Sequence, residues 1–507
     1  MEELIKISEV LDGYRIRKVD IIGNDGSESR YTEFFNLLKE GKLKNDTEAA
    51  KHFYGKKATD KSFAYRRFKS VFRERLINTL FFIDMQHPNF NDLETATMTI
   101  QKEWAAINIL FAKGDLQLPT LLAERLLPIA LKFELTEIVV YITDRLKNSY
   151  GGQIGNFKKY AYYKRLQKEQ MEIWQAEIQA KDLYQELRMY FIKSNAHKPF
   201  VAKIAQEGLE ALQPALEKYQ TSRLIYYAYI AKIGQYTTSR NYETAVMLCD
   251  EALDAFKKKP FEAQRLMNAF LNQKLVCYIT LKEYDKGQLL IEEILAVQTE
   301  GALSWFKTLE HATLLALHTK NYEDAYGFYT KARNRKEFAS LELRHLEIWH
   351  LYRAYLYFLI ASKNIKNLTV KSSEFDDFKM TRFVNDAAVF GRDKQGMNIP
   401  ILVLKLAMNL LDGKFGLVID SVEALGRFKQ RHMSREHALY RYNLFIKMVG
   451  QIPRAGFTKP LAKKLTEVSL RNLKAAPIQT DNQNLQTEII PLEDMWELLF
   501  NMLKNKQ

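Results

Sequence analysis

The chain has 507 residues, of which 47% are hydrophobic and 27% are charged, a balance typical of a folded protein and unlike that of a disordered one. Lysine and arginine exceed aspartate and glutamate by 14, and such an excess raises affinity for nucleic acid, anionic lipid or acidic protein surfaces without choosing among them. Because a single hydrophobic core stops growing at about 250 to 300 residues, the length predicts several domains or one extended stack of repeats.

Glycine and proline are scarce, with 21 and 11 residues, and this scarcity favours long helices over a turn-rich β fold. Cys249 and Cys277 are too few for a disulfide framework or a four-cysteine metal site. The N-terminus lacks the basic and apolar segments of a secretory signal, and apolar stretches such as 399–411 are too short to span a bilayer. We therefore expect a cytoplasmic, all-α protein with no membrane segment.

Residues 1–84 are predicted to form a small N-terminal helical module. Residues 14–22 and the following Gly-Asn-Asp-Gly indicate a strand or irregular arm that ends in a turn. Three helices then follow, at about 29–40, 45–55 and 60–82. Gly41 closes the first helix, and residues 45–48, Asn-Asp-Thr-Glu, form a capping box for the second, which Gly55 ends.

From residue 92 onward helix follows helix, for example at 118–133 and 135–148, until Gly151-Gly152 interrupts the pattern. The next stretch, 157–194, is long and repeats apolar residues every seven positions, at Leu166, Ile173, Ala180 and Leu187, accompanied by Glu169, Ala176, Leu183 and Tyr190. Such a repeat can form a coiled coil with another chain or pack against helices of the same chain. We favour packing within the chain, because its many amphipathic helices supply partners.

Three similar pentapeptides stand between pairs of apolar-periodic segments: Asn-Tyr-Glu-Thr-Ala at 241–245, Glu-Tyr-Asp-Lys-Gly at 283–287 and Asn-Tyr-Glu-Asp-Ala at 321–325. Each tyrosine is followed three positions later by a small residue, as expected where two helices approach closely. The pairs are Tyr242 with Ala245, Tyr284 with Gly287, and Tyr322 with Ala325. Six positions before the tyrosines stand Tyr236, Tyr278 and Ala316.

These segments resemble the inter-helix turn of tetratricopeptide repeats, although the tyrosines lie 42 and 38 residues apart and the family repeat has about 34. A weaker fourth candidate is 413–416, where Val418 stands at the small position. The resemblance implies an α-solenoid of helix-turn-helix repeats with a concave surface. We assign it to residues 92–475, with an insert near 373–400, followed by a linker and a C-terminal capping helix at 476–507.

No motif predicts catalysis, a metal or a cofactor. His345 and His350 are five positions apart, so their imidazoles point to different faces of a helix, unlike the histidines of zinc proteases. The glycines at 151–155 lack the Lys-Ser/Thr of a phosphate-binding loop, and no Gly-x-Ser-x-Gly sequence occurs. We predict no catalytic residue.

Two basic clusters are candidate contacts for nucleic acid or an acidic partner. The first lies on the third helix of the N-terminal module and contains Arg66, Arg67, Lys69 and Arg73, in an order that resembles a helix-turn-helix unit. The second contains Arg427, Lys429, Arg431 and Arg435, followed by Arg441. Either cluster can instead be an ordinary solvated cationic surface.

The leading hypothesis is a non-enzymatic scaffold that binds a peptide or helical segment of a protein partner in the solenoid groove. The alternative is a DNA-binding regulator whose N-terminal module contacts DNA and whose repeats sense a partner; an enzyme with an unrecognised site is a third hypothesis. Exposure of Arg66, Arg67 and Arg73 would favour DNA binding, whereas their pairing with Glu48 or Glu74 would favour a structural role. The sequence leaves the oligomeric state and the identity of the partner open.

Overall fold

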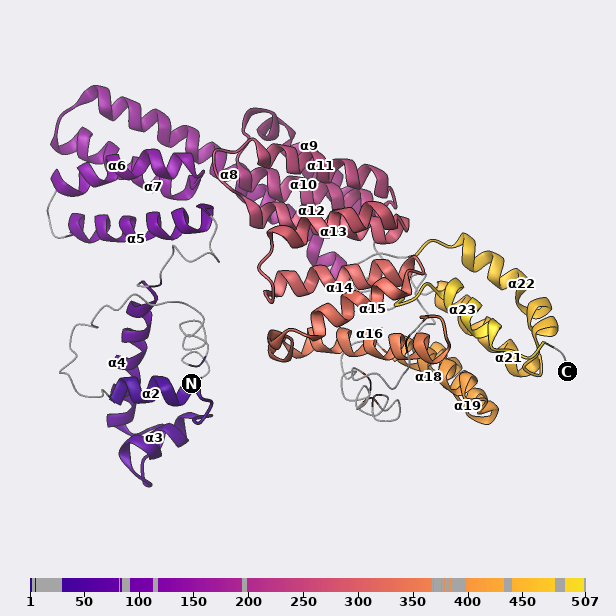
Figure 1. Ribbon diagram of the computed structural model, residues 1–507. Coiled ribbons are helices and arrows are strands. Elements are labelled where there is room, and N and C mark those ends of the chain that lie inside the picture. The colour runs from indigo at the N-terminus through magenta and orange to yellow at the C-terminus, as the bar shows by residue number, and fades with distance from the viewer. Residues whose placement is uncertain are drawn as a thin grey trace. The chain divides into compact units, whose positions relative to one another are not determined.

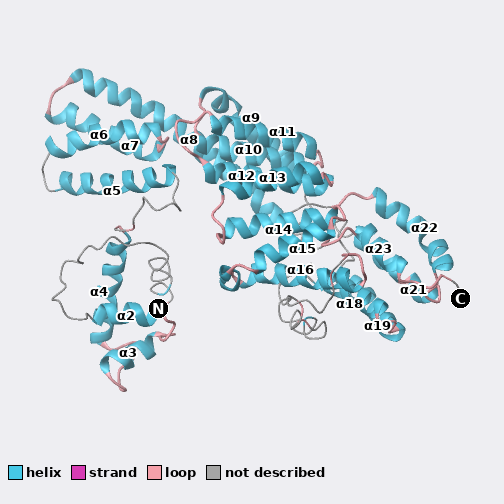
Figure 2. Cartoon of the chain, viewed as in Figure 1, coloured by secondary structure: helices cyan, strands magenta, loops and turns pink. Residues whose placement is uncertain are grey.

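The computed structural model describes residues 1, 5, 30–81, 83, 92–112, 117–193, 198–366, 368, 375, 378, 383, 398–432, 440–478 and 488–505. Within these residues the regular secondary structure is helical and no strand forms, apart from one isolated bridge between Thr458 and Lys504 (Figure 2). The prediction of an all-α protein is therefore confirmed. Consecutive helices pack mainly on their neighbours in the chain (Figure 1).

Three helices and an aromatic core make up the N-terminal module. The helices are α2 (Arg30–Lys39), α3 (Asp46–Tyr54) and α4 (Phe63–Leu80), close to the predicted ranges. Rings from all three helices pack together, and Phe34 lies 5.4 Å from Phe53 and 4.6 Å from Phe72 between ring centroids. The predicted arm at 14–22 and its turn lie outside the described residues.

A second group of helices follows, in which α6 and α7 match the segments predicted at 118–133 and 135–148. Its members are α5 (Asp92–Ala112), α6 (Gln117–Lys132), α7 (Thr136–Asn148) and a π-helical turn, Ser149–Gln153, before α8 (Phe157–Lys193). The glycine pair at 151–152 lies in this π turn, so the predicted interruption is where the helix loses its regular α geometry.

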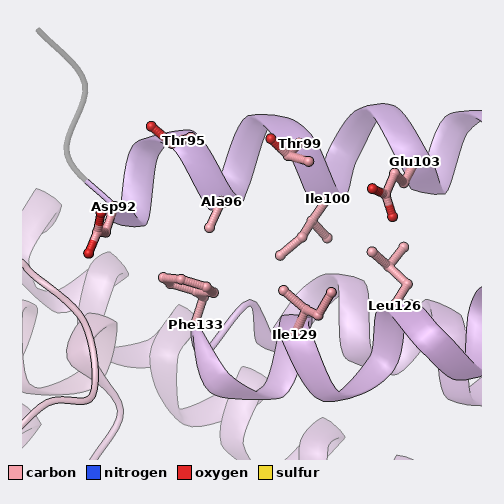
Figure 3. A pocket seen from close by; sticks show the side chains of 9 residues that line it. All are labelled: Asp92, Thr95, Ala96, Thr99, Ile100, Glu103, Leu126, Ile129 and Phe133. Atoms are coloured by element: carbon pink, nitrogen blue, oxygen red, sulfur yellow. The ribbon is translucent and has the colours of Figure 1, made fainter. Parts of the chain in front are cut away.

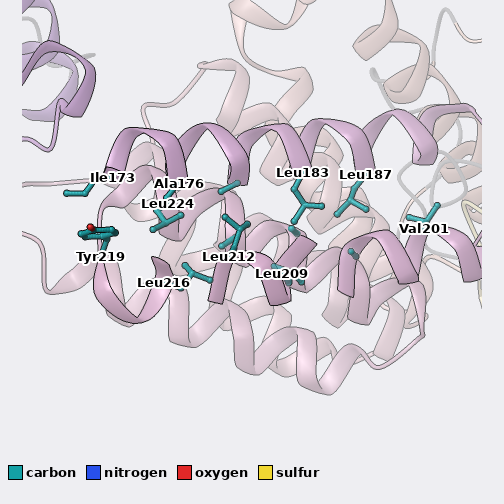
Figure 4. Close-up of a cluster of buried hydrophobic side chains, with 14 residues drawn as sticks. Ile173, Ala176, Leu183, Leu187, Val201, Leu209, Leu212, Leu216, Tyr219 and Leu224 are labelled. Carbon is teal, nitrogen blue, oxygen red and sulfur yellow. The ribbon is translucent and has the colours of Figure 1, made fainter. Parts of the chain in front are cut away.

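Helix α8 buries its seven-residue repeat inside the chain. Ile173, Ala180 and Leu187 lie in one hydrophobic cluster with residues of α9 (Lys198–Lys218) and α10 (Ser222–Thr238) (Figure 4). Glu169, the polar position in the repeat, is exposed. The repeat thus finds its partners among neighbouring helices of the same chain, as we predicted.

The central helices form successive antiparallel pairs. They are α11 (Tyr242–Lys257), α12 (Gln264–Leu281), α13 (Tyr284–Val297), α14 (Leu303–His318), α15 (Tyr322–Arg333), a 3₁₀ turn at Lys336–Ser340, and α16 (Leu343–Ala361). Helix α14 is buried on all sides from Trp305 to His318, with few exceptions. A helix that is covered all round belongs in the interior of a stack rather than at its surface.

The C-terminal helices are α18 (Asn398–Leu411), α19 (Phe415–His432), α20 (Tyr440–Val449), α21 (Gln451–Arg454), α22 (Lys459–Ala475) and α23 (Leu492–Asn501). Helix α23 corresponds to the predicted C-terminal helix, and α18 and α19 flank the weak fourth repeat candidate. Most of the predicted insert near 373–400 and of the linker at 479–487 lies outside the described residues.

The chain divides into two compact units. The first comprises residues 1–172 with 259–263, and the second comprises 173–258 with 264–507. The division falls inside α8, next to the exposed Glu169 in the seven-residue repeat.

One turn geometry recurs between paired helices. A residue with positive φ stands between the helices, and the next backbone N–H donates to a carbonyl five residues earlier, which is the Schellman arrangement. For the tyrosine-anchored pairs the donors and acceptors are Asn241 to Tyr236 (2.9 Å), Glu283 to Tyr278 (3.0 Å) and Asn321 to Ala316 (2.9 Å). The residue six positions before each tyrosine anchor therefore supplies the carbonyl oxygen that accepts this hydrogen bond and closes the turn.

The same turn occurs at five further places. Positive φ is found at Gly41, Glu134, Lys363, Gly413 and Gly456, and the following N–H again bonds five residues back. The sequence predicted the break between the segments 118–133 and 135–148, but not that the turns at Glu134, Lys363 and Gly456, which lack the tyrosine anchor, share the geometry of the anchored turns. The hairpin is thus a more general unit of this chain than the three sequence matches indicate.

The small positions after the tyrosine anchors are buried, as expected for close helix contact: Ala245 and Ala325 have no exposed surface. At Gly287 of α13 a Cβ atom would lie 2.3 Å from Leu315 Cδ2 of α14. Replacing Gly287 by valine should therefore destabilise the α13–α14 contact by about 2 to 3 kcal/mol through overpacking. Local opening free energies from amide hydrogen exchange in α13 and α14 measure this effect.

Gly327, in the middle of α15, is the matched control because a Cβ there would meet nothing within 4 Å. The Gly327→Val change should alter local stability by less than about 0.5 kcal/mol, since valine is not a worse helix former than glycine. Equal losses in the two variants would contradict the close-approach argument.

Candidate functional site

The N-terminal module carries a concentrated positive charge. Residues 30–81 contain thirteen lysines and arginines against six aspartates and glutamates, so about a tenth of the chain holds a net charge of +7 out of +14. Arg66, Arg67 and Arg73 are exposed on α4. Arg66 and Arg73 are seven positions apart and lie on one face of α4, and Arg67 lies about 100° around the helix from Arg66. We call these three exposed arginines the α4 ridge.

The ridge is held by the packing of the opposite face of α4. Tyr65, Phe68, Phe72 and Leu76 are buried there, so the remaining face must point to solvent. Neither Arg66 nor Arg67 has an ion-pair partner among the described residues, and the phenyl ring of Phe63, at the start of the helix, is 74% exposed. An exposed aromatic ring beside arginines is the arrangement found where proteins contact nucleic acid.

Glu48 does not pair with the ridge. Its carboxylate accepts hydrogen bonds from the Lys44 N–H (3.0 Å) and from Asn45 Nδ2 (2.8 Å), while Asn45 Oδ1 accepts from the Glu48 N–H (2.9 Å). These bonds cap α3, so the predicted capping box is present and occupies Glu48. Glu74 is exposed on α4.

Lys69, predicted with the ridge arginines, is half-buried at the border of the buried face of α4. Its Nζ is 2.7 Å from Asp46 Oδ1, which also accepts a 2.7 Å hydrogen bond from the Tyr65 hydroxyl. Burial raises the pKa of Asp46, but hydrogen bonds from Lys69 and Tyr65 outweigh it and hold that pKa below its usual value. Lys69 therefore joins α4 to the start of α3.

The described residues of the second basic cluster differ in exposure. Arg427 is exposed and lies 3.4 Å from Glu423, and Lys429 is half-buried. Arg431 is in the last turn of α19 but its side chain is not described, and Arg435 lies outside the described residues. Arg441, at the end of this cluster, is only 5% exposed.

Arg441 is the centre of a buried polar network that fastens the C-terminal segment. Its guanidinium donates to both carboxylate oxygens of Glu488, at 2.8 and 2.9 Å, and to a carboxylate oxygen of Glu493. It also donates to the carbonyls of Leu473 and Ala476 at the end of α22. One side chain of α20 thus joins the C-terminal end of α22 to the segment that leads into α23.

The same segment is bound by residues at the turns of two central hairpins. Lys282 Nζ lies 3.0 Å from Glu493, and Lys320 Nζ lies 3.1 Å from Asp494 and 2.6 Å from Glu497. Lys282 and Lys320 are the positive-φ residues of their turns. Three acidic residues of one helix are therefore held by equivalent turn positions of neighbouring hairpins.

His318, at the end of α14, completes this network. It is 1% exposed, and its Nε2 lies 2.6 Å from the Glu488 carbonyl oxygen. A carbonyl oxygen only accepts, so Nε2 carries the hydrogen. Nδ1 is buried without a hydrogen-bond partner, which favours the neutral ring with no hydrogen on this nitrogen. Burial lowers the pKa of His318 to about 4.

This depressed pKa predicts acid sensitivity. As the pH falls from the ordinary histidine pKa toward 4, the unfolded state takes up the proton before the folded state does, so stability is lost over that window. The loss from His318 should reach about 3 kcal/mol, and His318→Gln should make urea unfolding less dependent on pH. The same pH dependence in the wild type and the variant would exclude His318 as its source.

An open groove of about 260 Å³ lies between α5 and α6 (Figure 3). Its floor is apolar and contains Ile100, Leu126, Ile129 and Phe133, while Asp92, Thr95, Thr99 and Glu103 stand along α5. The Ile129 side chain is 44% exposed. An apolar floor bordered by polar groups of fixed position is typical of a binding groove.

No constellation for catalysis or metal binding was found in the described part of the chain. Burial raises the pKa of both thiols, that of Cys277 to about 12, so neither cysteine is an activated nucleophile. Within the described ranges no group of three or more His, Cys, Asp or Glu side chains is placed to hold a metal ion. None of the described helices has both the length and the apolar character needed to cross a membrane.

Comparison of the chain with protein-family models, with curated proteins and with solved structures found no match. Sequence reasoning identified the α4 ridge but not the α5–α6 groove, whose lining is divided between two helices. Sequence reasoning also placed Arg441 in a surface cluster, because Glu488 and Glu493, whose carboxylates pair with it, are 47 and 52 positions away in the chain.

Proposed function

We propose that this chain is a non-enzymatic scaffold that resembles tetratricopeptide-repeat proteins and binds a peptide or helical segment of a protein partner. In this proposal the paired helices form an α-solenoid, in which each hairpin packs on its neighbours and the array presents grooves between helices. We assign the binding site for the protein partner to the α5–α6 groove.

The observation that carries the proposal is this groove, whose apolar floor is open to solvent at Ile129 while Ile100 and Leu126 beneath are buried. Ile129 keeps 44% of its surface exposed although it lies beside Leu126 and Phe133, and an unfilled apolar groove gains free energy when a ligand covers it. The recurring Schellman turn supports the repeat architecture, because it gives successive hairpins one geometry despite their different lengths.

Site-specific photocrosslinking tests the proposal. A benzoylphenylalanine at position 129 should trap a defined protein in cells that make this chain, and Glu103→Arg or Phe133→Asp should remove the adduct. The same label at Leu289, a 69% exposed residue of α13, is the matched control and should not trap that protein. No adduct at 129, or equal adducts at both positions, would reject the groove as the partner site.

The second candidate function, a DNA-binding regulator, is favoured by the α4 ridge. Three exposed arginines of one helix, in a module with a net charge of +7, match the electrostatic pattern of nucleic-acid contacts. The Gly55–Ser62 link between α3 and α4 is longer than the turn of about three or four residues usual in helix-turn-helix units. Binding to duplex and single-stranded DNA across a salt series tests this function.

A further inference from the structure

The outer face of α22 carries an exposed apolar stripe. Leu461, Leu465 and Val468 are 40%, 43% and 60% exposed. The adjoining face of the helix is buried against α20, α21 and α23 through Ala462, Thr466, Ser469 and Leu473. Helix α22 thus has one face for its own chain and a second apolar face open to solvent.

The exposed residues follow a heptad pattern. After Leu461, Leu465 and Val468 come Asn472 and Ala475, and all five are exposed. The spacing alternates between four and three residues, which is the d, a, d, a, d order of a coiled-coil seam. A single polar residue at an a position, here Asn472, is a known means of fixing register between helices. We call these five residues the α22 seam.

The charge beside the seam is positive. Lys464 and Arg471 immediately precede the two a positions and so occupy g positions, where coiled-coil helices make ion pairs with a partner. Lys463 and Lys474 are also exposed, and Glu467 is the one acidic residue of the helix. A partner helix that complements this face must therefore carry acidic residues beside its apolar seam.

We propose that the α22 seam binds an amphipathic helix of another protein, with apolar residues at a and d and acidic residues flanking them. This site is separate from the α5–α6 groove and does not depend on the function proposed for it. Ion pairs between lysines and acidic residues of a helix already occur within this chain, where Lys282 and Lys320 pair with acidic residues of α23.

Two other occupants fit the face less well. A second copy of this chain would bring basic g residues against basic g residues in an antiparallel pair, and like charges at these positions repel. A membrane surface is usually met by a broad apolar face with tryptophan or phenylalanine. The α22 seam is narrow and contains neither residue.

A designed peptide provides the probe. It has 21 residues, with leucine at a and d, one asparagine at the a position meant to face Asn472, and glutamate at e and g; a second peptide has lysine in place of glutamate. Fluorescence anisotropy with the full chain should show binding of the acidic peptide alone at low salt. Its affinity should fall at least about tenfold in 0.3 M salt because exposed ion pairs are screened.

Variants on the seam separate its apolar and charged contributions. Val468→Glu should abolish binding, while Val297→Glu, at a 57% exposed residue of α13, should leave it unchanged. Lys464→Glu combined with Arg471→Glu should transfer binding to the lysine peptide. These residues are exposed, so circular dichroism and the melting temperature should match the wild type.

Three results would overturn the proposal. The first is failure of the acidic peptide to bind, or equal binding to the Val468→Glu variant. The second is sedimentation with phosphatidylglycerol vesicles that Val468→Glu abolishes, which would assign the face to a membrane. The third is concentration-dependent self-association that the same substitution abolishes, which would assign the face to a second copy.

Discussion

Replacing Arg66, Arg67 and Arg73 together by alanine should weaken binding of the chain to duplex DNA by roughly a thousandfold near 0.1 M salt. The reason is that each arginine on the α4 ridge can contact one phosphate, and a charged hydrogen bond contributes about 1.5 kcal/mol or more. The triple substitution should also lower the slope of log affinity against log salt by about 3, or roughly 0.9 per lost contact.

The matched control removes three positive charges elsewhere. Lys463, Lys464 and Arg471 are exposed on α22, so their replacement by alanine changes the net charge by the same amount. If both triple variants lose affinity equally, binding reflects total charge and the α4 ridge has no special part in it. If the chain does not bind DNA even at low salt, the regulator function is rejected and the scaffold remains.

The exposure of the ridge could be predicted because it depends on local pattern. In α4 the apolar residues Phe68, Phe72 and Leu76 recur at helical spacing, so the arginines between them had to face outward. The capping box at Asn45 and the turns at the tyrosine anchors were predictable for the same reason. Each depends on residues within a single helix or turn.

The turns at Glu134 and Lys363 show where local pattern fails. They have the same backbone geometry as the tyrosine-anchored turns, but a Schellman turn is closed by backbone atoms and tolerates many side chains. Left-handed φ at a residue other than glycine costs about 1 kcal/mol, which packing of α6 on α7 can offset at Glu134. The sequence therefore carries no strong mark of these turns.

The α5–α6 groove and the Arg441 network depend on contacts between distant segments. In the sequence Arg441 belongs to a cluster of basic residues, and only the structure shows that Glu488 and Glu493 pair with it. A single sequence gives no information about such pairing. The α22 seam lies between these cases, since its heptad spacing is visible in the sequence but its exposure is not.

Replacing Arg441 by leucine should destabilise the C-terminal helices by about 3 to 5 kcal/mol, because it leaves the buried Glu488 carboxylate without its counter-charge. Opening free energies from amide hydrogen exchange in α20, α22 and α23 measure this loss. Arg427→Leu is the control. Arg427 is exposed and lies 3.4 Å from Glu423, and such surface pairs contribute less than about 1 kcal/mol.

Two further measurements separate the ion pair from simple loss of packing. Arg441→Leu combined with Glu488→Leu should lose less stability than the sum of the single changes, since neither charge is then left buried alone.

Burial raises the pKa of Glu493, but Arg441 and Lys282 outweigh it and hold that pKa below its usual value. The folded state therefore binds the proton more weakly than the unfolded state, so this stabilisation is present above the ordinary glutamate pKa and is lost as the pH falls through the depressed one. The difference between wild type and Arg441→Leu should accordingly shrink in acid, and a difference that stays constant with pH would assign the effect of Arg441 to packing alone.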